Sequence, residues 1–222
     1  MLKAAAQLFV LLLPWPLRRP LLNLLFRYEI HPSARIGVSI VTVGRLVMGP
    51  HSRIGHLTLA KGLSELEIEE SGLIGNLNWI TAAPKDDRVF FLADVDRNPR
   101  LFVGRHAAIT NRHLIDCTDS VSVGEFTTVG GWRSQILTHS IDIRQSRQSA
   151  NPIRIGRYCF VGTGAILLKG SELPDYSVLA AGSVLTKKFE RPLALYSGVP
   201  AVDAGSLPGD AAYFNRATGF IS

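Results

Sequence analysis

The sequence predicts a mainly β protein in which short strands wind into stacked coils, that is, a parallel β-helix. The first observation is a repeat, because an aliphatic residue occupies every sixth position six times in succession. The second is that small residues follow several of these positions, as Gly156, Gly162 and Ala180 do. The third is the composition, since 20 glycines and 12 prolines with 19% charged residues are typical of many short strands joined by turns. The repeated aliphatic positions are Ile155, Val161, Leu167, Leu173, Leu179 and Leu185.

A period of six residues fits one short strand plus one turn. It matches neither the 3.6-residue period of an α-helix nor the simple alternation of an ordinary strand. The aliphatic residue is expected to point inward, the small residue to permit a tight turn, and three units to form a coil of about 18 residues. Stacked coils would repeat at about 4.8 Å, the usual spacing of neighbouring strands. The same step recurs upstream at Ile68, Ile74 and Ile80, at Val103, Ile109 and Ile115, and, after a shift of two residues, at Val123 and Val129, while Ile36 and Ile54 lie three steps apart.

The repeat divides the chain into three parts. Residues 1–30 form an apolar and amphipathic segment with short helices, residues 31–201 form the β-helix, and residues 202–222 form a tail. Residues 83–100 and 137–152 interrupt the repeat. Loops of this length inside a compact repeat are usually functional or disordered, so these two excursions are where a site is expected.

The N-terminal segment has two apolar stretches that are too short to span a bilayer. Pro14 and Pro16 separate them, and no small-residue cleavage site follows, so neither a transmembrane helix nor a signal peptide fits. Two roles stay open. The segment either packs on the first coil as a cap, or it lies on an anionic membrane surface with Arg18, Arg19 and Arg27 at its polar edges.

Charge and cysteine content narrow the function. The net charge of +6 favours anionic partners, which include acidic lipid and a phosphorylated coenzyme. The arginines are scattered and no basic run is interleaved with aromatic residues, which argues against nucleic acid. Cys117 and Cys159 belong to no metal-binding pattern, so we expect free buried thiols, no metal site, and a reducing, cytoplasmic environment.

The segment IGRYCFVGTGAILLKGSELPDYSVLAAGSVLTKKF, followed by SGVPA, resembles the hexapeptide-repeat acyltransferases. The resemblance is strong over residues 100–201 and weaker over residues 31–80, and it is nearest to the exopolysaccharide and colanic-acid-type sugar O-acetyltransferases. It implies a left-handed parallel β-helix and transfer of an acetyl group from acetyl-CoA to a hydroxyl of a sugar or polysaccharide precursor. It also implies a homotrimer whose active sites lie between subunits.

The catalytic candidate is His139, which lies in the second excursion within the segment Thr-His-Ser-Ile-Asp. A neutral imidazole is well suited to remove a hydroxyl proton near pH 7. The resemblance implies that His139 is this general base, because related sugar acetyltransferases carry a Thr-His pair at this place. Asp142 or Asp116 is expected to orient the ring, and Asp116 is also a candidate for contact with the acceptor. His113, in the sequence NRHLID, is the alternative base or a supporting residue.

The resemblance also implies where the coenzyme binds. Thr163 and Ala181 match positions that hold the pantetheine arm, and small side chains there let an extended arm approach the backbone. Thr186 and Lys187 match positions near the nucleotide phosphates, for which a lysine supplies positive charge. Trp132 is expected either to stack on the sugar acceptor or to serve as a structural aromatic residue.

Three other functions remain open. A xenobiotic or antibiotic acetyltransferase would use the same fold and the same donor. A non-catalytic hexapeptide scaffold would bind no coenzyme. A carbonic anhydrase of the γ class would hold zinc through three histidines, but the spacing of His106, His113 and His139 departs from that pattern.

Overall fold

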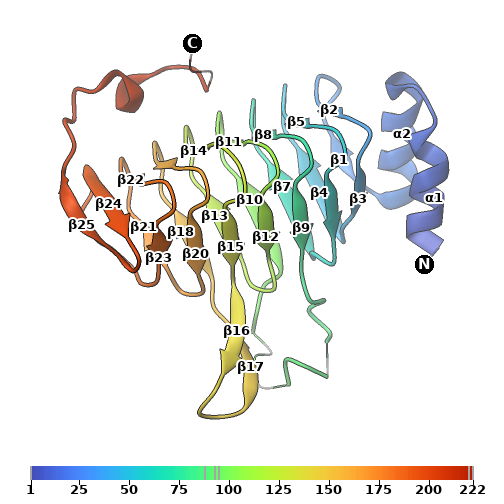
Figure 1. Cartoon of the computed structure of the whole chain (residues 1–222). Coiled ribbons are helices and arrows are strands. Elements are labelled where there is room, and N and C mark those ends of the chain that lie inside the picture. Colours follow the sequence, from blue (N-terminus) through green and yellow to red (C-terminus); the bar gives the residue numbers. More distant parts are fainter. Residues whose placement is uncertain (1, 88, 93, 95, 220, 222) are drawn as a thin grey trace.

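The structure is a computed structural model that describes residues 2–87, 89–92, 94, 96–219 and 221. Three sheets, parallel except for the last strand of sheet B, form the three faces of a left-handed β-helix, as the repeat and the family resemblance predict (Figure 1). Sheet A contains β1 (Glu29–Ile30), β4 (Arg45–Met48), β7 (Glu65–Ile68), β10 (Arg100–Val103), β13 (Val121–Val123), β18 (Ile153–Ile155) and β21 (Glu172–Leu173). Sheet B contains β2 (Arg35–Ile36), β5 (Arg53–Ile54), β8 (Leu73–Ile74), β11 (Ala108–Ile109), β14 (Thr128–Val129), β19 (Phe160–Val161), β22 (Val178–Leu179), β24 (Ala194–Gly198) and β25 (Ala201–Ser206). Sheet C contains β3 (Ile40–Thr42), β6 (Leu59–Lys61), β9 (Trp79–Thr81), β12 (Leu114–Asp116), β15 (Gln135–Leu137), β20 (Ile166–Leu168) and β23 (Val184–Leu185).

The repeated aliphatic residues form the core, because each pairs with its equivalent one coil further on. Ile155 lies opposite Leu173, eighteen residues later, whereas Ile54 lies opposite Ile74, twenty residues later. The two additional residues therefore enlarge some coils without moving the apolar ladder out of register. Side chains along this ladder are fully buried from Leu46 onward. Burial of aliphatic groups against the neighbouring coils is what stabilises such an array.

The helices α1 (Leu2–Leu11) and α2 (Trp15–Phe26) cover the open end of the first coil, and we call them the N-terminal cap (Figure 1). The first coil has no preceding strand, so its backbone groups need other partners. Gln7 Oε1 accepts a hydrogen bond of 3.0 Å from the Val41 amide, and Arg18 donates one of 3.0 Å to the Gly37 carbonyl. Arg18 is thus buried and structural, not at the polar edge where a membrane contact would place it. None of the helices in the described residues is long and apolar enough to cross a bilayer.

The opposite end of the β-helix is closed by a change of strand direction. Strand β24 is parallel to β22, and β25 returns antiparallel to β24, so the last ladder is a hairpin. Strand β25 runs across the boundary expected between residues 201 and 202. The tail then turns back over the coils through a 3₁₀-helix, Ala212–Asn215, in which the Tyr213 hydroxyl donates a hydrogen bond of 2.7 Å to the Cys159 carbonyl. Cys117 and Cys159 are both free and buried, as expected.

Both interruptions of the repeat leave the coils after a strand of sheet C. The first connects β9 to β10, and the second is an antiparallel hairpin of β16 (His139–Asp142) and β17 (Arg147–Ala150). They project from the same side of the β-helix and lie next to each other (Figure 1). The Ala150 amide donates a hydrogen bond of 2.8 Å to the Asp94 carboxylate, which ties the hairpin to the first loop.

Candidate active site

His139 and Asp116 form a hydrogen-bonded pair where the hairpin leaves sheet C. His139 is the first residue of β16, and Asp116 ends β12, the strand beside β15. Because Asp116 pairs with Leu137 in the ladder, its side chain lies directly beside the start of the hairpin. The Nδ1 atom of His139 is 2.7 Å from Oδ2 of Asp116.

The Asp116 carboxylate is buried and fully occupied by donors. It accepts hydrogen bonds from the Thr118 amide (3.1 Å), the Thr118 hydroxyl (2.6 Å), the Thr138 hydroxyl (2.9 Å) and the His139 amide (3.1 Å). Burial acts to raise the pKa of Asp116, but the hydrogen bonds from His139, Thr118 and Thr138 outweigh burial and lower it below its ordinary value. The carboxylate is therefore ionised at neutral pH.

An ionised partner determines which nitrogen of the neutral His139 ring carries the hydrogen. A carboxylate with no proton can only accept, so Nδ1 of His139 carries the hydrogen and donates it. Nε2 is then the unprotonated nitrogen of the neutral ring. The His139 side chain is 38% exposed, so this lone pair is available to a bound substrate. The arrangement suits a general base whose orientation is held by the carboxylate.

Phe91, from the first excursion, contacts His139, and Arg97 from the same excursion contacts Phe91. The ring of Phe91 meets the imidazole edge to face, with centroids 5.7 Å apart and an interplanar angle of 82°. The guanidinium of Arg97 lies 4.3 Å from the centroid of the Phe91 ring. Arg97 is buried and donates to the carbonyls of Ala83 (3.0 Å) and Thr118 (3.1 Å), so it joins the loop to the strand end that carries Asp116.

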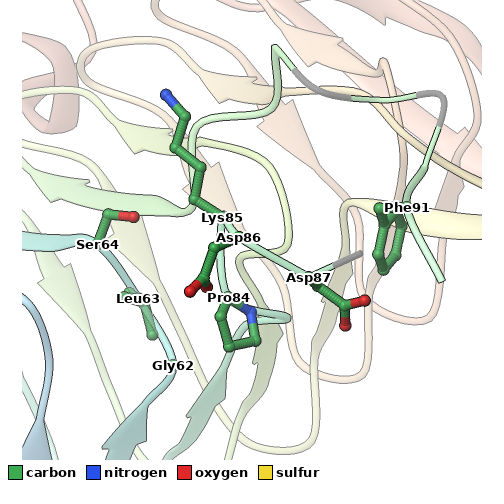
Figure 2. A pocket seen from close by; sticks show the side chains of 8 residues that line it. All are labelled: Gly62, Leu63, Ser64, Pro84, Lys85, Asp86, Asp87 and Phe91. Carbon is green, nitrogen blue, oxygen red and sulfur yellow. The ribbon is translucent and has the colours of Figure 1, made fainter. Parts of the chain in front are cut away.

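A hollow of about 460 Å³ lies beside this group of residues. Figure 2 shows that the turn Gly62–Ser64 borders it on one side and that the first excursion, with Asp86, Asp87 and Phe91, borders it on the other. Only glycine fits at position 62, because φ is +84° and an added Cβ would collide with the Ala82 carbonyl oxygen. The hollow offers hydroxyl and carboxylate groups next to the aromatic ring that touches His139.

Asp142 and His113 lie away from this pair. Asp142 accepts hydrogen bonds from the amides of Arg144 (2.9 Å) and Gln145 (3.2 Å) and thereby forms the turn of the hairpin. Of the two carboxylates expected to orient His139, the structure therefore brings Asp116 to the ring and not Asp142.

His113 is buried between coils rather than projecting toward a cleft. Its Nδ1 accepts a hydrogen bond of 3.2 Å from the Ser134 amide, and its Nε2 is 3.0 Å from the Thr110 hydroxyl. Burial lowers the pKa of His113 to about 4, so the ring is neutral at pH 7. With both nitrogens engaged and the ring 2% exposed, His113 has no free atom for a substrate or a metal. Within the described residues, no group of three or more His, Cys, Asp or Glu side chains is arranged to hold a metal ion.

The residues expected to bind the coenzyme lie along two edges of sheet C. Thr163 and Ala181 occupy the same turn in successive coils, where the Gly182 amide donates to the Thr163 carbonyl (2.9 Å). An added Cβ at Gly162 would lie 2.5 Å from the Ala181 amide nitrogen, so the backbones can pack this closely only because Gly162 has no side chain. Trp132 lies next to them, because its amide donates to the Thr163 hydroxyl (2.9 Å).

The other two coenzyme candidates lie across the sheet. Thr186 and Lys187 follow β23, so they are at the edge where strands of sheet C end, as His139 is. The turn with Thr163 is at the edge where these strands begin. Trp132 shares that edge, and its exposed ring is stacked against the Arg112 guanidinium at 5.0 Å. Trp132 is thus beside the expected coenzyme groove rather than beside His139.

Sequence reasoning missed three residues of the site, namely Phe91, Arg97 and Thr118. Phe91 and Arg97 belong to an excursion whose length alone marked it as functional. Thr118 follows Asp116 by two residues, and an Asp-x-Thr pattern at a strand end is the local signal that such a hydrogen bond would give.

Comparisons with known proteins identify similar solved structures. No protein family model matches the chain, and no curated protein does. The polysialic acid O-acetyltransferase OatWY is 16% identical, the alignment covers 86% of this chain and 90% of that one, and the TM-score is 0.52. A hexapeptide-repeat acetyltransferase from Vibrio cholerae O1 biovar eltor, solved with acetyl coenzyme A, is 18% identical over 93% and 86% of the two chains, with a TM-score of 0.47. An N-acyltransferase from Bacillus cereus, solved with dTDP and coenzyme A, is 11% identical over 85% of each chain, with a TM-score of 0.47. At 16% identity the likeness to the polysialic acid O-acetyltransferase confirms the fold alone.

Proposed function

We propose that the protein is an acyl-CoA-dependent O-acetyltransferase that moves an acetyl group to a hydroxyl of a sugar or polysaccharide precursor. The observation that carries this proposal is the Asp116–His139 pair, in which a buried ionised carboxylate accepts the Nδ1 hydrogen, so that the lone pair of the neutral imidazole is on Nε2. His139 begins the hairpin that leaves the β-helix, and Asp116 ends the neighbouring strand β12 of sheet C. The proposal combines the chemistry of this pair with the family resemblance carried by the repeat.

The proposed reaction needs no covalent enzyme intermediate. Nε2 of His139 removes the acceptor hydroxyl proton while the hydroxyl oxygen attacks the thioester carbonyl carbon. The tetrahedral intermediate then collapses, the carbon–sulfur bond breaks, and the coenzyme leaves as a thiolate that takes the proton back from the imidazolium. Asp116 stays ionised throughout and stabilises the imidazolium.

The donor site is proposed to lie between subunits of a homotrimer. Within one chain, His139 and the pair of Thr163 and Ala181 lie at opposite edges of sheet C, about 10–15 Å apart for strands of this length. A second subunit packed against sheet C would bring its own small-residue groove to His139. Lys187, at the same edge as His139, would then supply positive charge to the coenzyme phosphates.

The outer face of sheet C has the composition of a covered surface. At the first residue of each strand of sheet C, the outward side chain is apolar in six of seven strands, whereas the outward positions of sheet A carry charged residues such as Arg45, Glu65 and Glu67. Trp79 and Leu114 on sheet C are 54% and 41% exposed in the single chain. Covering such a face removes apolar area from water, which is what a stable subunit interface does. The first residues of the strands are Ile40, Leu59, Trp79, Leu114, Gln135, Ile166 and Val184, and the outward residues at the strand ends are Thr42, Lys61, Thr81, Leu137 and Leu168.

The hollow beside Phe91 is proposed to receive the acceptor. Its carboxylates, from Asp86 and Asp87, can accept hydrogen bonds from sugar hydroxyls, and the Ser64 hydroxyl can donate one. We also place the reaction in the cytoplasm, since the two free thiols are typical of a reducing compartment.

Calorimetric titration with acetyl-CoA, followed by a screen of sugars with antibiotics as a comparison panel, tests this proposal. We expect saturable binding of about one coenzyme per subunit and acetyl transfer to a sugar. Transfer to an antibiotic and to no sugar would overturn the acceptor class. Absence of coenzyme binding by folded, trimeric protein would overturn the transferase proposal and favour a scaffold.

A further inference from the structure

The N-terminal cap shows a second apolar face that the β-helix does not cover. Its inner face packs on the first coil through Val10, Leu22 and Phe26. Its outer face presents six large apolar side chains, each more than half exposed: Leu8, Phe9, Leu12, Leu17, Leu24 and Leu25. In α2 the exposed Leu17 and Leu24 are seven residues apart and share one helix face, whereas the buried Leu22 and Phe26 are four residues apart on the opposite side. The cap therefore both closes the fold and exposes an apolar surface.

The charged residues of the cap are basic. No acidic residue occurs before Glu29 in the sequence, and Arg27 is exposed at the end of α2. Arg19 is half-buried and donates to the Ile30 carbonyl at 3.1 Å, so its charge remains at the edge of the cap.

A basic groove of about 500 Å³ adjoins the cap at Trp15. It is lined by the exposed side chains of Arg35 and Arg53 from the first two strands of sheet B, together with His56. In the part of the chain that the structure describes, no carboxylate lies within ion-pair distance of either arginine, and no acidic residue lines the groove. Its charges are thus available to an anionic partner.

We propose that the N-terminal cap binds an anionic lipid surface. The exposed leucines and Phe9 would enter the interface, while Arg27, Arg35 and Arg53 would face the lipid phosphates. A second copy of this chain fits less well, because a cap-to-cap contact would bring arginines of like charge together in a protein of net charge +6. The cap lies at the end of the β-helix remote from β24 and β25, so the β-helix would stand away from the membrane (Figure 1).

Vesicle flotation of the full chain tests this inference with two kinds of liposome, phosphatidylcholine alone and phosphatidylcholine mixed with phosphatidylglycerol. We expect binding to the mixed vesicles that weakens with salt and little binding to the neutral ones. The double variant Leu12→Glu with Leu24→Glu should weaken binding by about tenfold or more, because both side chains are exposed and would carry charge into the interface. The double variant Arg35→Gln with Arg53→Gln should weaken it by about fivefold per charge. The matched control, Ile143→Glu with Val202→Glu, changes equally exposed apolar residues elsewhere and should bind as the wild type does.

Three results would overturn the inference. One is no binding to anionic vesicles by the wild-type protein. Another is equal binding by the wild type, the cap variant and the control. The third is a combined result, in which the cap variant has a lower oligomeric state in light scattering and the wild type does not bind vesicles. The outer face of the cap would then be an interface between two copies of the chain. Acetyl-CoA titration of the same variants should give wild-type affinity, so failure here is distinguishable from failure of the proposed function.

Discussion

Asp116→Asn is the most informative single change in the site. The asparagine side chain has one oxygen and one NH₂ group, so whichever way it is turned, one group of donors around Asp116 loses its acceptor. Oδ2 of Asp116 faces two donors of His139 and the Thr138 hydroxyl, whereas Oδ1 faces the Thr118 amide and hydroxyl. If the NH₂ group takes the Oδ2 place, the His139 amide loses its acceptor. The ring must then accept at Nδ1 and carry its proton on Nε2. If the asparagine side chain is turned over, its NH₂ group takes the Oδ1 place, and the backbone amide of Thr118 loses its acceptor instead.

These two outcomes lead to separate, measurable losses. An unsatisfied buried backbone donor costs about 1–3 kcal/mol of stability in either orientation. In the first orientation the tautomer that protonates Nε2 removes the general base, for which the usual contribution is about 10²–10⁴-fold in rate. In the second orientation Nε2 keeps its lone pair, but the imidazolium formed in the reaction loses the negative charge that stabilises it. We therefore expect kcat to fall by about 10²-fold or more with coenzyme affinity nearly unchanged.

The assay is release of the coenzyme thiol in the presence of the acceptor found by screening, with thermal unfolding measured in parallel. The matched control is Asp142→Asn, since Asp142 contacts only turn amides of the hairpin. We expect the control to keep kcat within about threefold. Wild-type kcat in Asp116→Asn, or equal losses in both variants, would refute the reasoning.

Three further predictions concern other parts of the site. Phe91→Ala should lower kcat by about tenfold and leave coenzyme affinity unchanged, because Phe91 packs against the His139 ring. Phe91→Leu should restore part of the lost activity, and an unchanged kcat in Phe91→Ala would show that His139 needs no such support. Ala181→Trp should weaken acetyl-CoA binding by about tenfold or more in calorimetry at an unchanged melting temperature, because the residue is exposed on the expected groove, and wild-type affinity would place the coenzyme elsewhere. The free energy of unfolding should fall as pH falls from about 6.5 to about 4, because of His113. Its ring takes up a proton near pH 6.5 in the unfolded chain, but in the folded chain burial lowers its pKa to about 4. The loss should reach about 3 kcal/mol below pH 4 in urea titrations, and His113→Gln should remove it, whereas an identical pH dependence in the variant would contradict the burial argument.

The β-helix could be predicted because its signal is local. Every sixth residue between Ile155 and Leu185 has an aliphatic side chain that points into the core, and this pattern can be recognised without knowing any distant contact. The excursion that carries His139 could also be found, since the repeat stops at Leu137 and resumes at Ile153. The repeat and its interruption can both be recognised because each coil of a stacked array places its residues in the same environment.

The partner of His139 could not be chosen from the sequence, because it depends on how coils align. Asp142 is three residues from His139 along the chain, but the hairpin carries it to the turn. Asp116 is 23 residues away, and it meets the ring because the coil between them pairs it with Leu137, 21 residues later, and so sets β12 beside β15. His113 was misleading for the same reason, since the next coil buries it through Ser134.

The Phe91 loop and the N-terminal cap show two other limits. Phe91 lies in an irregular excursion, where no periodicity indicates which residue will return to the site. The sequence presents packing on the first coil and contact with a membrane as two separate roles for the cap. A helix can bury one apolar face and expose another, as α2 does at Leu22 and Leu24.

Comparison of His139→Ala with wild type in acetyl transfer and in acetyl-CoA binding tests the central claim most directly. Because the side chain is partly exposed, the variant should fold, and Ser140→Ala on the next, exposed position is a matched control. We predict that kcat falls by about 10²–10⁴-fold in His139→Ala while the Kd for acetyl-CoA stays within about twofold, with both values unchanged in the control. Full transfer activity in His139→Ala would contradict the account and remove His139 from the reaction.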